Sequence, residues 1–312
     1  MEKFTVIVPQ FLAGERLDKA LSRLYPQHSR ARLQSWIKAG RVVVDNRILR
    51  QKDTVTPGQS IVITPIFEPE QRHQGEAIPL DILFEDEEIL IINKPAGLTV
   101  HPGAGNPEHT LLNALLYYHG GLERVARAGI VQRLDKDTSG IMVIAKTPEA
   151  HTYLVRELRA RNIHREYQAV VAGVVTGGGQ VDAPIGRHPI HRKRMAVVDS
   201  GKAAVTHYRI IRKYAAFTHL QIMLETGRTH QIRVHMAHLH HPVVGDPQYG
   251  WRRRIPGKLP ETLAILVRNF PRQALHASRL ELAHPVTGKL MQWSAPLPED
   301  FQSLIDELER GN

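Results

Sequence analysis

Apolar side chains recur at helical spacing twice near the start of the chain, and each pattern has a recognisable end. The first pattern stops at Pro26, and the second lies between Ser29, which suits the start of a helix, and Gly40, which suits its end. Apolar runs at residues 42–44 and 55–63 follow and predict short strands. The pattern therefore predicts a small unit of two helices followed by a small sheet.

A polar, proline-bearing stretch separates this small unit from the rest of the chain. Residues 65–79 show no apolar periodicity, and we interpret them as a linker. We therefore expect a first domain over residues 1–70, with its core at about 15–63, and a second domain over residues 80–312.

Beyond the linker, apolar runs typical of strands outnumber strand–helix–strand units. We expect strands over residues 82–84, 88–92, 167–175, 204–211, 219–225, 275–282 and 290–293. We expect helices over residues 111–118, 147–161, 229–240 and 298–308. The order of these elements predicts an α+β fold, in which a mixed, mainly antiparallel sheet is flanked by helices.

The composition is that of an ordinary globular chain with a strongly basic charge balance. Of 312 residues, 42% are hydrophobic and 23% are charged, which is ample material for a core. The formal net charge of +10 indicates a polyanionic partner, most often a nucleic acid. We find neither an apolar leader segment nor a run of about 18 apolar residues, so we expect no membrane association. Cysteine is absent, which excludes disulfides and fits a cytoplasmic location.

The most informative motif is the octapeptide at residues 133–140, which reads Arg-Leu-Asp-Lys-Asp-Thr-Ser-Gly. Apolar residues precede it at 130–131 and follow it at 141–145, which predicts a strand, a tight loop and a second strand. Because Arg133 and Asp135 are two residues apart, their side chains would emerge on the same face of an extended segment. A loop held in this way can direct a guanidinium and a carboxylate at one spot.

The same residue types would also suit two other functions. Asp135, Asp137 and Asp246 could serve a metal-dependent nucleoside hydrolase or glycosyltransferase. Histidines gathered at residues 230–241 have a spacing compatible with zinc, but their order matches no metal site that we can name, so we expect no metal. A basic chain without any catalysis would instead suit an RNA-binding ribosome-assembly factor.

The octapeptide resembles the signature of the RluA/RluD family of RNA pseudouridine synthases. Further blocks of that family's pattern follow in order, at residues 93–102, 165–167, 227–235 and 245–250. The full pattern is most similar to the members that act on large-subunit (23S) ribosomal RNA. One departure is visible, because Gln132 stands where the family usually has histidine. We expect this side chain to point away from Arg133 and Asp135, into the scaffold.

The resemblance implies a catalytic second domain with an active-site cleft and a specific role for several residues. Asp135 is the expected catalytic carboxylate, and Arg233 is expected to pair with it, with Arg228 as the substitute candidate. Tyr167 is expected to stack on the uracil ring. Uridine and pseudouridine are isomers, so no cofactor is expected. We further expect Arg133 to fill the space that a flipped uridine leaves.

Two further groups of basic residues are candidate RNA contacts. The first domain resembles the RNA-binding domain first named for ribosomal small-subunit protein four. Its second helix carries Arg30, Arg32, Lys38 and Arg41 on or beside it. A dense basic loop later in the chain contains Arg192, Lys193 and Arg194. The expected partner is large-subunit ribosomal RNA or a pre-ribosomal particle, bound by a monomer without a small-molecule cofactor.

Overall fold

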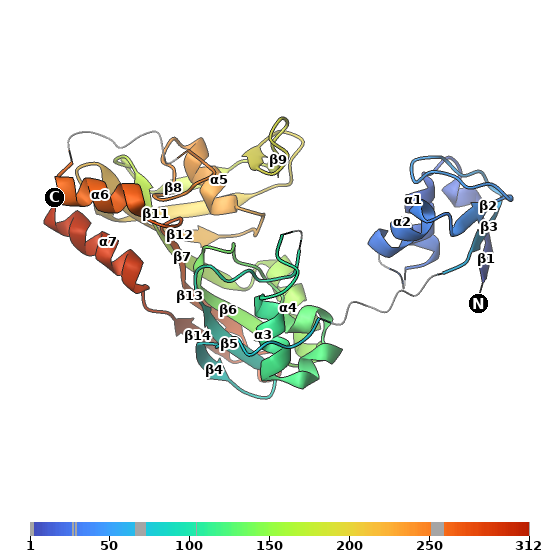
Figure 1. Cartoon of the computed structure of the whole chain (residues 1–312), viewed down its shortest axis with the longest axis horizontal. Coiled ribbons are helices and arrows are strands. Elements are labelled where there is room, and N and C mark those ends of the chain that lie inside the picture. Colours follow the sequence, from blue (N-terminus) through green and yellow to red (C-terminus); the bar gives the residue numbers. More distant parts are fainter. Residues whose placement is uncertain are drawn as a thin grey trace. The chain divides into compact units, whose positions relative to one another are not determined.

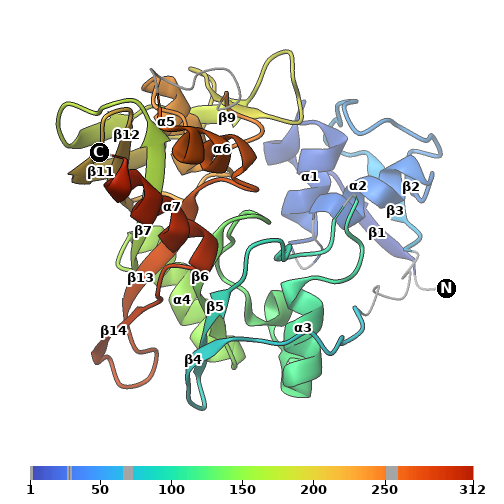
Figure 2. The ribbon, with the colours of Figure 1, turned by 60° about the vertical axis from the view of Figure 1, so that its left-hand side comes forward.

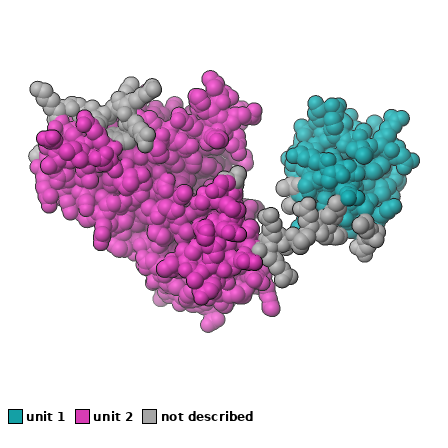
Figure 3. All heavy atoms as spheres, in the orientation of Figure 1, with its two compact units in different colours: residues 1–72 teal, residues 73–312 magenta. Residues whose placement is uncertain are grey.

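The computed structural model describes residues 3–26, 28, 30–65, 73–103, 105–250 and 259–311. The chain forms two compact units, Met1–Arg72 and His73–Asn312, which Figure 1 and Figure 3 show. Each unit has its own hydrophobic core. The expected helix cap Ser29 and residues 66–72 of the expected linker lie outside the described residues.

The first unit packs two helices against a three-stranded antiparallel sheet. The sheet has the order β1-β3-β2. Its core gathers the apolar faces of both helices, with Leu17, Leu21, Leu33 and Trp36 buried. The elements are β1 (Phe4–Ile7), the 3-10 helix η1 (Gln10–Leu12), α1 (Leu17–Leu24), α2 (Arg30–Lys38), β2 (Val42–Val44) and β3 (Ser60–Ile63).

The second unit is built on a nine-stranded sheet of the order β4-β5-β6-β13-β7-β12-β11-β8, with β14 paired to β13. Strands β6 and β13 run parallel, and the other described pairings are antiparallel. The predicted α+β class with a mixed, mainly antiparallel sheet is confirmed. The strands are β4 (Ile82–Glu85), β5 (Ile89–Lys94), β6 (Ser139–Ala145), β7 (His164–Ala172), β8 (Gly179–Asp182), β11 (Val205–Lys213), β12 (Phe217–Leu224), β13 (Leu275–Ala283) and β14 (Leu290–Ser294).

Helices lie on both faces of this sheet (Figure 2). A separate two-stranded ribbon is formed by β9 (Ile185–Arg187) and β10 (Met195–Val197). Helices α6 and α7 pack side by side near the C-terminus (Figure 1). The helices are α3 (Leu111–Tyr118), η2 (Gly120–Arg124), η3 (Ala126–Gly129), α4 (Pro148–Ala160), α5 (Gln231–His238), α6 (Glu261–Asn269) and α7 (Glu299–Arg310).

The alternation of side chains along the central strands explains why both faces of the sheet are covered. Leu90 and Ile92 of β5 belong to one core cluster with α3, whereas Ile89 and Ile91 belong to another cluster with α4. Successive strand residues point to opposite faces, so a continuous apolar run supplies both cores. The sheet is therefore packed on both faces where the site described below is attached.

The prediction of a strand just before the octapeptide is wrong. Residues 130–131 form no strand, and Ile130 makes a single bridge to Ile144. The 3-10 helix η3 precedes them and contains two non-glycine residues in the left-handed region, Arg127 at φ 56° and Ala128 at φ 51°. The octapeptide thus connects an irregular segment to β6, and only its second expected strand exists.

Candidate active site

The octapeptide loop is fixed at its end by a close approach between β6 and β13. Gly140 pairs with Ala277 and has a φ of +119°, a conformation that other residues avoid. A Cβ atom at this position would lie 2.2 Å from the backbone oxygen of Ala277. Ser139 beside it shares a hydrogen bond of 2.9 Å with Nδ1 of His276. The loop therefore enters β6 in one defined position.

A buried lysine anchors the octapeptide loop through hydrogen bonds to backbone carbonyl groups. Lys94 is 1% exposed, and its Nζ donates to the carbonyl oxygens of Pro95, Leu98 and Lys136 at 2.7, 3.0 and 3.0 Å. Burial lowers the pKa of Lys94 to about 7, although the charges of Asp137 and Asp135 act in the opposite direction. Lys136 lies inside the octapeptide, so Lys94 connects the loop to the turn after β5.

Asp135 is paired with Arg233, as the sequence predicted. Nη1 of Arg233 donates to Oδ2 of Asp135 at 2.9 Å. Nε and Nη2 of Arg233 donate to the two oxygens of Asp246 at 2.7 and 2.9 Å. Burial alone would lower the pKa of Arg233, but the hydrogen bonds and charges of Asp246 and Asp135 raise it above its usual value. A permanently charged guanidinium thus joins a fully buried carboxylate to a partly exposed one.

The second oxygen of Asp135 faces the cavity and a histidine. Oδ1 of Asp135 lies 3.8 Å from Nε2 of His230, which caps the start of α5 with a φ of 57°. Nδ1 of His230 and the hydroxyl of Tyr249 are 2.7 Å apart, and the Tyr249 ring lies 5.0 Å from the guanidinium of Arg233. Burial lowers the pKa of His230, against the charge of Asp135, so the ring is neutral at neutral pH.

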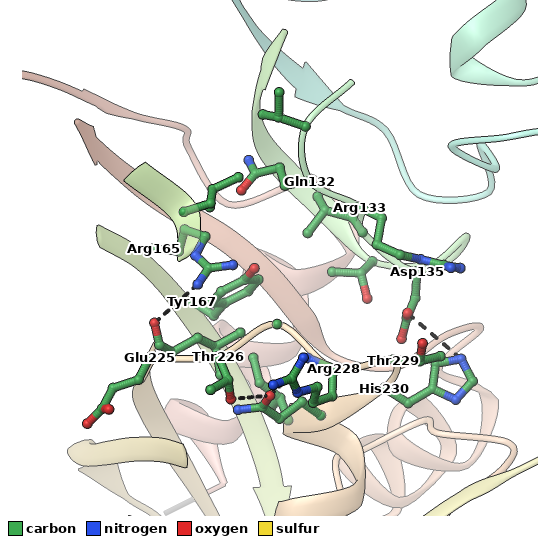
Figure 4. A pocket seen from close by; sticks show the side chains of 18 of the residues that line it. Gln132, Arg133, Asp135, Arg165, Tyr167, Glu225, Thr226, Arg228, Thr229 and His230 are labelled. Atoms are coloured by element: carbon green, nitrogen blue, oxygen red, sulfur yellow. Dashed lines mark hydrogen bonds and ion pairs between the residues drawn. The ribbon is translucent and has the colours of Figure 1, made fainter. Parts of the chain in front are cut away.

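Tyr167 lies between Arg165 and Asp135 in the view of Figure 4. It stands on β7, paired with Ile222 and Ala277 of the neighbouring strands, and is 7% exposed. Burial raises the pKa of the Tyr167 hydroxyl, and the charge of Asp135 adds to this effect. The hydroxyl therefore keeps its proton at neutral pH.

These residues line one large basic cavity of about 840 Å³ (Figure 4). Its charged walls carry seven arginines and two carboxylates, Asp135 and Glu225. The arginines are Arg127, Arg133, Arg159, Arg161, Arg165, Arg228 and Arg233. A cavity with this balance suits a polyanionic ligand that brings an uncharged ring to the Asp135 carboxylate.

The structure corrects the expectation for Gln132. Gln132 lines the cavity as Arg133 does, so it is not buried in the scaffold, although its side chain points away from Arg133 and Asp135 in Figure 4. The segment before Asp135 is not a regular strand of the sheet. Arg133 is exposed on the cavity wall, whereas Arg228 is partly held by the carbonyl oxygen of Ala203 at 3.0 Å.

The other predicted RNA contacts lie outside this cavity. Arg192, Lys193 and Arg194 are exposed on the segment that joins β9 to β10. In the first unit, Lys38 is exposed and Arg32 and Arg41 are partly exposed. Arg30 already donates to buried Asp18 at 2.7 Å, so this arginine also stabilises its own unit.

Sequence reasoning missed several residues that complete the site. Lys94 and His230 lie within blocks that we noted, but nothing in one sequence shows which block residue is buried beneath another. Asp246 was considered only as a metal ligand, whereas both its oxygens accept hydrogen bonds from Arg233.

Within the described ranges, no group of three or more His, Cys, Asp or Glu side chains is placed to hold a metal ion. Among the described helices, none has the length and apolar character needed to cross a membrane.

Comparison with known proteins agrees with the fold and the site. Residues 88–238 match the RNA pseudouridylate synthase family, and residues 15–61 match the S4 domain family. A relative from Pseudomonas aeruginosa, ribosomal large subunit pseudouridine synthase D, is 56% identical over 97% of this chain and 95% of its own. The protein of the same name from Escherichia coli is 52% identical over 97% and 94%.

A solved structure shows the same fold. Human RNA pseudouridylate synthase domain containing 4 aligns with a TM-score of 0.57 and 27% identity, over 73% of this chain and 93% of its own. The fold and the cavity define the class of an enzyme that isomerises uridine in RNA. The chain belongs to the RNA pseudouridine synthase family, and the resemblance inferred from its sequence blocks is confirmed.

Proposed function

We propose that this enzyme converts uridines of large-subunit ribosomal RNA to pseudouridine, with Asp135 as the catalytic carboxylate. The observation that carries the proposal is the pairing of Asp135 with buried Arg233 at the wall of an arginine-lined cavity. The choice of RNA rests on the relatives, whose names refer to the large ribosomal subunit. A substrate of this kind implies action in the cytoplasm, where the chain would bind ribosomal RNA or a pre-ribosomal particle as a monomer.

The reaction breaks one bond to ribose and forms another. The bond from uracil N1 to ribose C1′ breaks, the base turns, and C5 joins C1′. N1 gains a proton and C5 loses one, so substrate and product have the same atoms and no oxidant or reductant is consumed. The Asp135 carboxylate could attack either ribose C1′ or the uracil ring, and both routes need an anionic nucleophile beside the target nucleotide.

Arg233 and Tyr167 would support the carboxylate in different ways. Arg233 favours the ionised form of Asp135 and fixes the direction of Oδ2, which leaves Oδ1 free for the substrate. The Tyr167 ring would stack on uracil, a contact worth roughly 1–3 kcal/mol per base. The Tyr167 hydroxyl is protonated, so it could relay the proton that leaves C5 only if it released its own proton as it accepted that one.

The target uridine must leave its stack to reach Asp135, which costs a few kcal/mol. Arg133 is exposed on the same wall as Asp135, and its planar guanidinium can hydrogen-bond and stack where the base was. Outside the cavity, Arg30, Arg32, Lys38, Arg41 and the segment with Arg192, Lys193 and Arg194 would contact RNA phosphates.

Mapping of pseudouridine in cells tests this proposal. Total RNA from cells with and without the gene is treated with carbodiimide and read by primer extension, in which each pseudouridine stops the polymerase. We expect stops in large-subunit ribosomal RNA that vanish without the gene and return with the wild-type gene, but not with Asp135→Asn. Unchanged stops throughout ribosomal RNA, or stops lost only from another RNA, would reject the proposed substrate.

A further inference from the structure

Two arginines of the cavity wall have no role in the reaction described above. Arg159 lies on α4, and with Val155 and Leu158 it forms the face of that helix that lines the cavity. Arg127 lies on η3, which packs against both α4 and β6. Both side chains are exposed at the cavity wall, on the side formed by α4 and η3.

These two arginines differ from their neighbours because their guanidinium groups are not engaged. Arg161 forms an ion pair with Glu225, and Arg165 donates to the carbonyl oxygen of Leu224 at 3.5 Å. In the part of the chain that the structure describes, the guanidinium groups of Arg127 and Arg159 form no hydrogen bond or ion pair. Exposed like charges on one wall repel each other unless an anion lies between them.

The backbone at Arg127 is held in an unfavourable conformation. Arg127 has φ 56° and ψ 35°, and Ala128 follows with φ 51° and ψ 38°. Gly129 follows them and lies so close to β6 that a Cβ there would be 1.9 Å from the backbone oxygen of Ala145. Strain of this kind persists where packing fixes it, and at a cavity wall it motivates a functional role for the side chain.

The electrostatic environment also favours an anion at this wall. Burial lowers the pKa of His101 to about 4, and the charges of Arg127 and Arg133 add to this effect. His101 is therefore neutral at neutral pH, and the positive potential comes from the arginines. Phosphate groups are the anions that an RNA substrate brings, and they are contacted chiefly by arginine and lysine.

We propose that Arg127 and Arg159 bind backbone phosphates of the RNA strand beside the target uridine, on the α4 side of the cavity. The inference rests on the proposed function, since the strand must pass the cavity that receives its base. The two arginines would hold the strand and would not touch the reacting atoms. They would set the affinity for RNA rather than the rate of the chemical step.

Single-turnover tritium release tests the inference. The substrate is a transcript of large-subunit ribosomal RNA labelled with [5-³H]uridine, which releases tritium when C5 joins C1′. For the pair Arg127→Gln and Arg159→Gln, we expect the half-saturating protein concentration at 0.15 M salt to rise on the order of tenfold. The plot of log affinity against log salt should flatten by about 0.7 for each lost contact. The rate at saturation should stay within about twofold of wild type.

A matched pair of nearby arginines provides the control. Arg156 lies on the same helix, pairs with Glu157 at 2.9 Å and does not line the cavity. Arg124 lies just before η3, is exposed and also does not line it. The pair Arg124→Gln and Arg156→Gln removes the same charge, and we expect wild-type affinity and salt slope. An equal loss in both pairs would show a general charge effect and would overturn the inference.

Two further measurements separate binding from folding and from protein contacts. Arg127→Gly relieves the left-handed strain, so we expect an unchanged or higher Tm together with weaker RNA binding. Unchanged affinity would contradict a phosphate contact.

Neutral methylphosphonates placed beside the target uridine should weaken RNA binding by the wild type but not by the Arg127→Gln, Arg159→Gln double variant. Equal weakening of both proteins would overturn the inference. A loss of affinity that appears only with ribosomal particles that contain protein, and not with the free transcript, would also overturn the inference. If wild type releases no tritium at all, the proposed function fails, while filter binding of the same transcript still tests the two arginines.

Discussion

At the scale of single residues, the guanidinium of Arg233 divides its donors between two carboxylates. Asp246 takes two of them and is fully buried, whereas Asp135 takes one and is 16% exposed. This division orients Arg233 through Asp246 and leaves one oxygen of Asp135 uncommitted to the guanidinium. A buried charge needs such pairing, since removal of one partner leaves an uncompensated ion.

Arg133→Ala should slow turnover far more on a structured stem-loop than on a short single strand. Arg133 would hold the flipped state, and a single strand has no stack from which the uridine must be flipped. The comparison of tritium release from the two RNAs measures this difference, with a loss of roughly tenfold expected to be specific to the stem-loop. Equal losses on both RNAs would instead assign Arg133 to a phosphate.

The sequence predicted the pairing of Asp135 with Arg233 because both residues lie in recognisable family blocks. It did not predict Asp246 as the second partner of Arg233, because the turn that brings Asp246 back to α5 depends on tertiary packing. The expectation that Gln132 lies in the scaffold was wrong, because the segment that carries it is not a strand of the sheet and borders the cavity.

At the scale of elements, the contact between β6 and β13 positions the octapeptide loop. Gly140→Ala should destabilise the protein by on the order of 3 kcal/mol, because the new methyl group would collide with the Ala277 oxygen. Gly288→Ala is a suitable control, since Gly288 also has a positive φ of 67° but has open space around it. It should cost about 1 kcal/mol. Urea denaturation compares the two variants, and equal midpoints would contradict the close approach.

Strand β12 carries a buried histidine beneath α7 that should make the protein sensitive to acid. Burial lowers the pKa of His219 from 6.5 to about 4, and its Nε2 atom has no hydrogen-bond partner among the residues that the structure describes. Below pH 6.5 the unfolded chain binds the proton more readily, so the free energy of unfolding falls as pH falls towards 4. The loss attributable to this group is up to about 3 kcal/mol.

The variant His219→Leu should therefore lose less stability than wild type between pH 7 and pH 4. The exposed residue His119 supplies the control variant, His119→Leu, which should follow the wild-type pH profile. Denaturation at a series of pH values measures both profiles. Parallel profiles for His219→Leu and wild type would show that this histidine does not contribute.

Regular elements were predictable where apolar periodicity is long, and irregular ones were not. The helix expected over residues 147–161 is α4, with Thr147 as its cap, because the cap, the proline and the pattern agree. The strand expected at residues 130–131 is absent, because η3 turns the chain through left-handed residues that no composition rule foretells. Helix α6 and the short strands β8 to β10 were also not predicted. These strands have only three or four residues each, too few to show a period, whereas α6 does carry apolar residues at Leu263, Leu266 and Val267 that the sequence analysis did not use.

At the scale of the whole molecule, two units with separate cores carry different tasks in the proposed function. Deletion of residues 1–70 should weaken RNA binding without removing the chemistry, because the cavity residues all belong to the second unit. The deleted segment carries 11 Lys and Arg against 7 Asp and Glu, which is +4 of the total of +10.

Lost phosphate contacts should flatten the plot of log affinity against log salt for the shortened protein. Tritium release at saturating protein serves as the control, since it should remain measurable. An identical salt slope in the full and shortened proteins would show that the first unit does not contact the RNA.

The most direct measurement is single-turnover tritium release by Asp135→Asn, with RNA affinity measured on the same protein. Asparagine preserves the size of the side chain but removes the anionic oxygen that the reaction needs. Asp137→Asn, two residues along the same loop, is the matched control. We expect Asp135→Asn to release no tritium while it binds RNA within about tenfold of wild type, and Asp137→Asn to remain active. Tritium release by Asp135→Asn at the wild-type rate would contradict the assignment of Asp135 as the catalytic carboxylate.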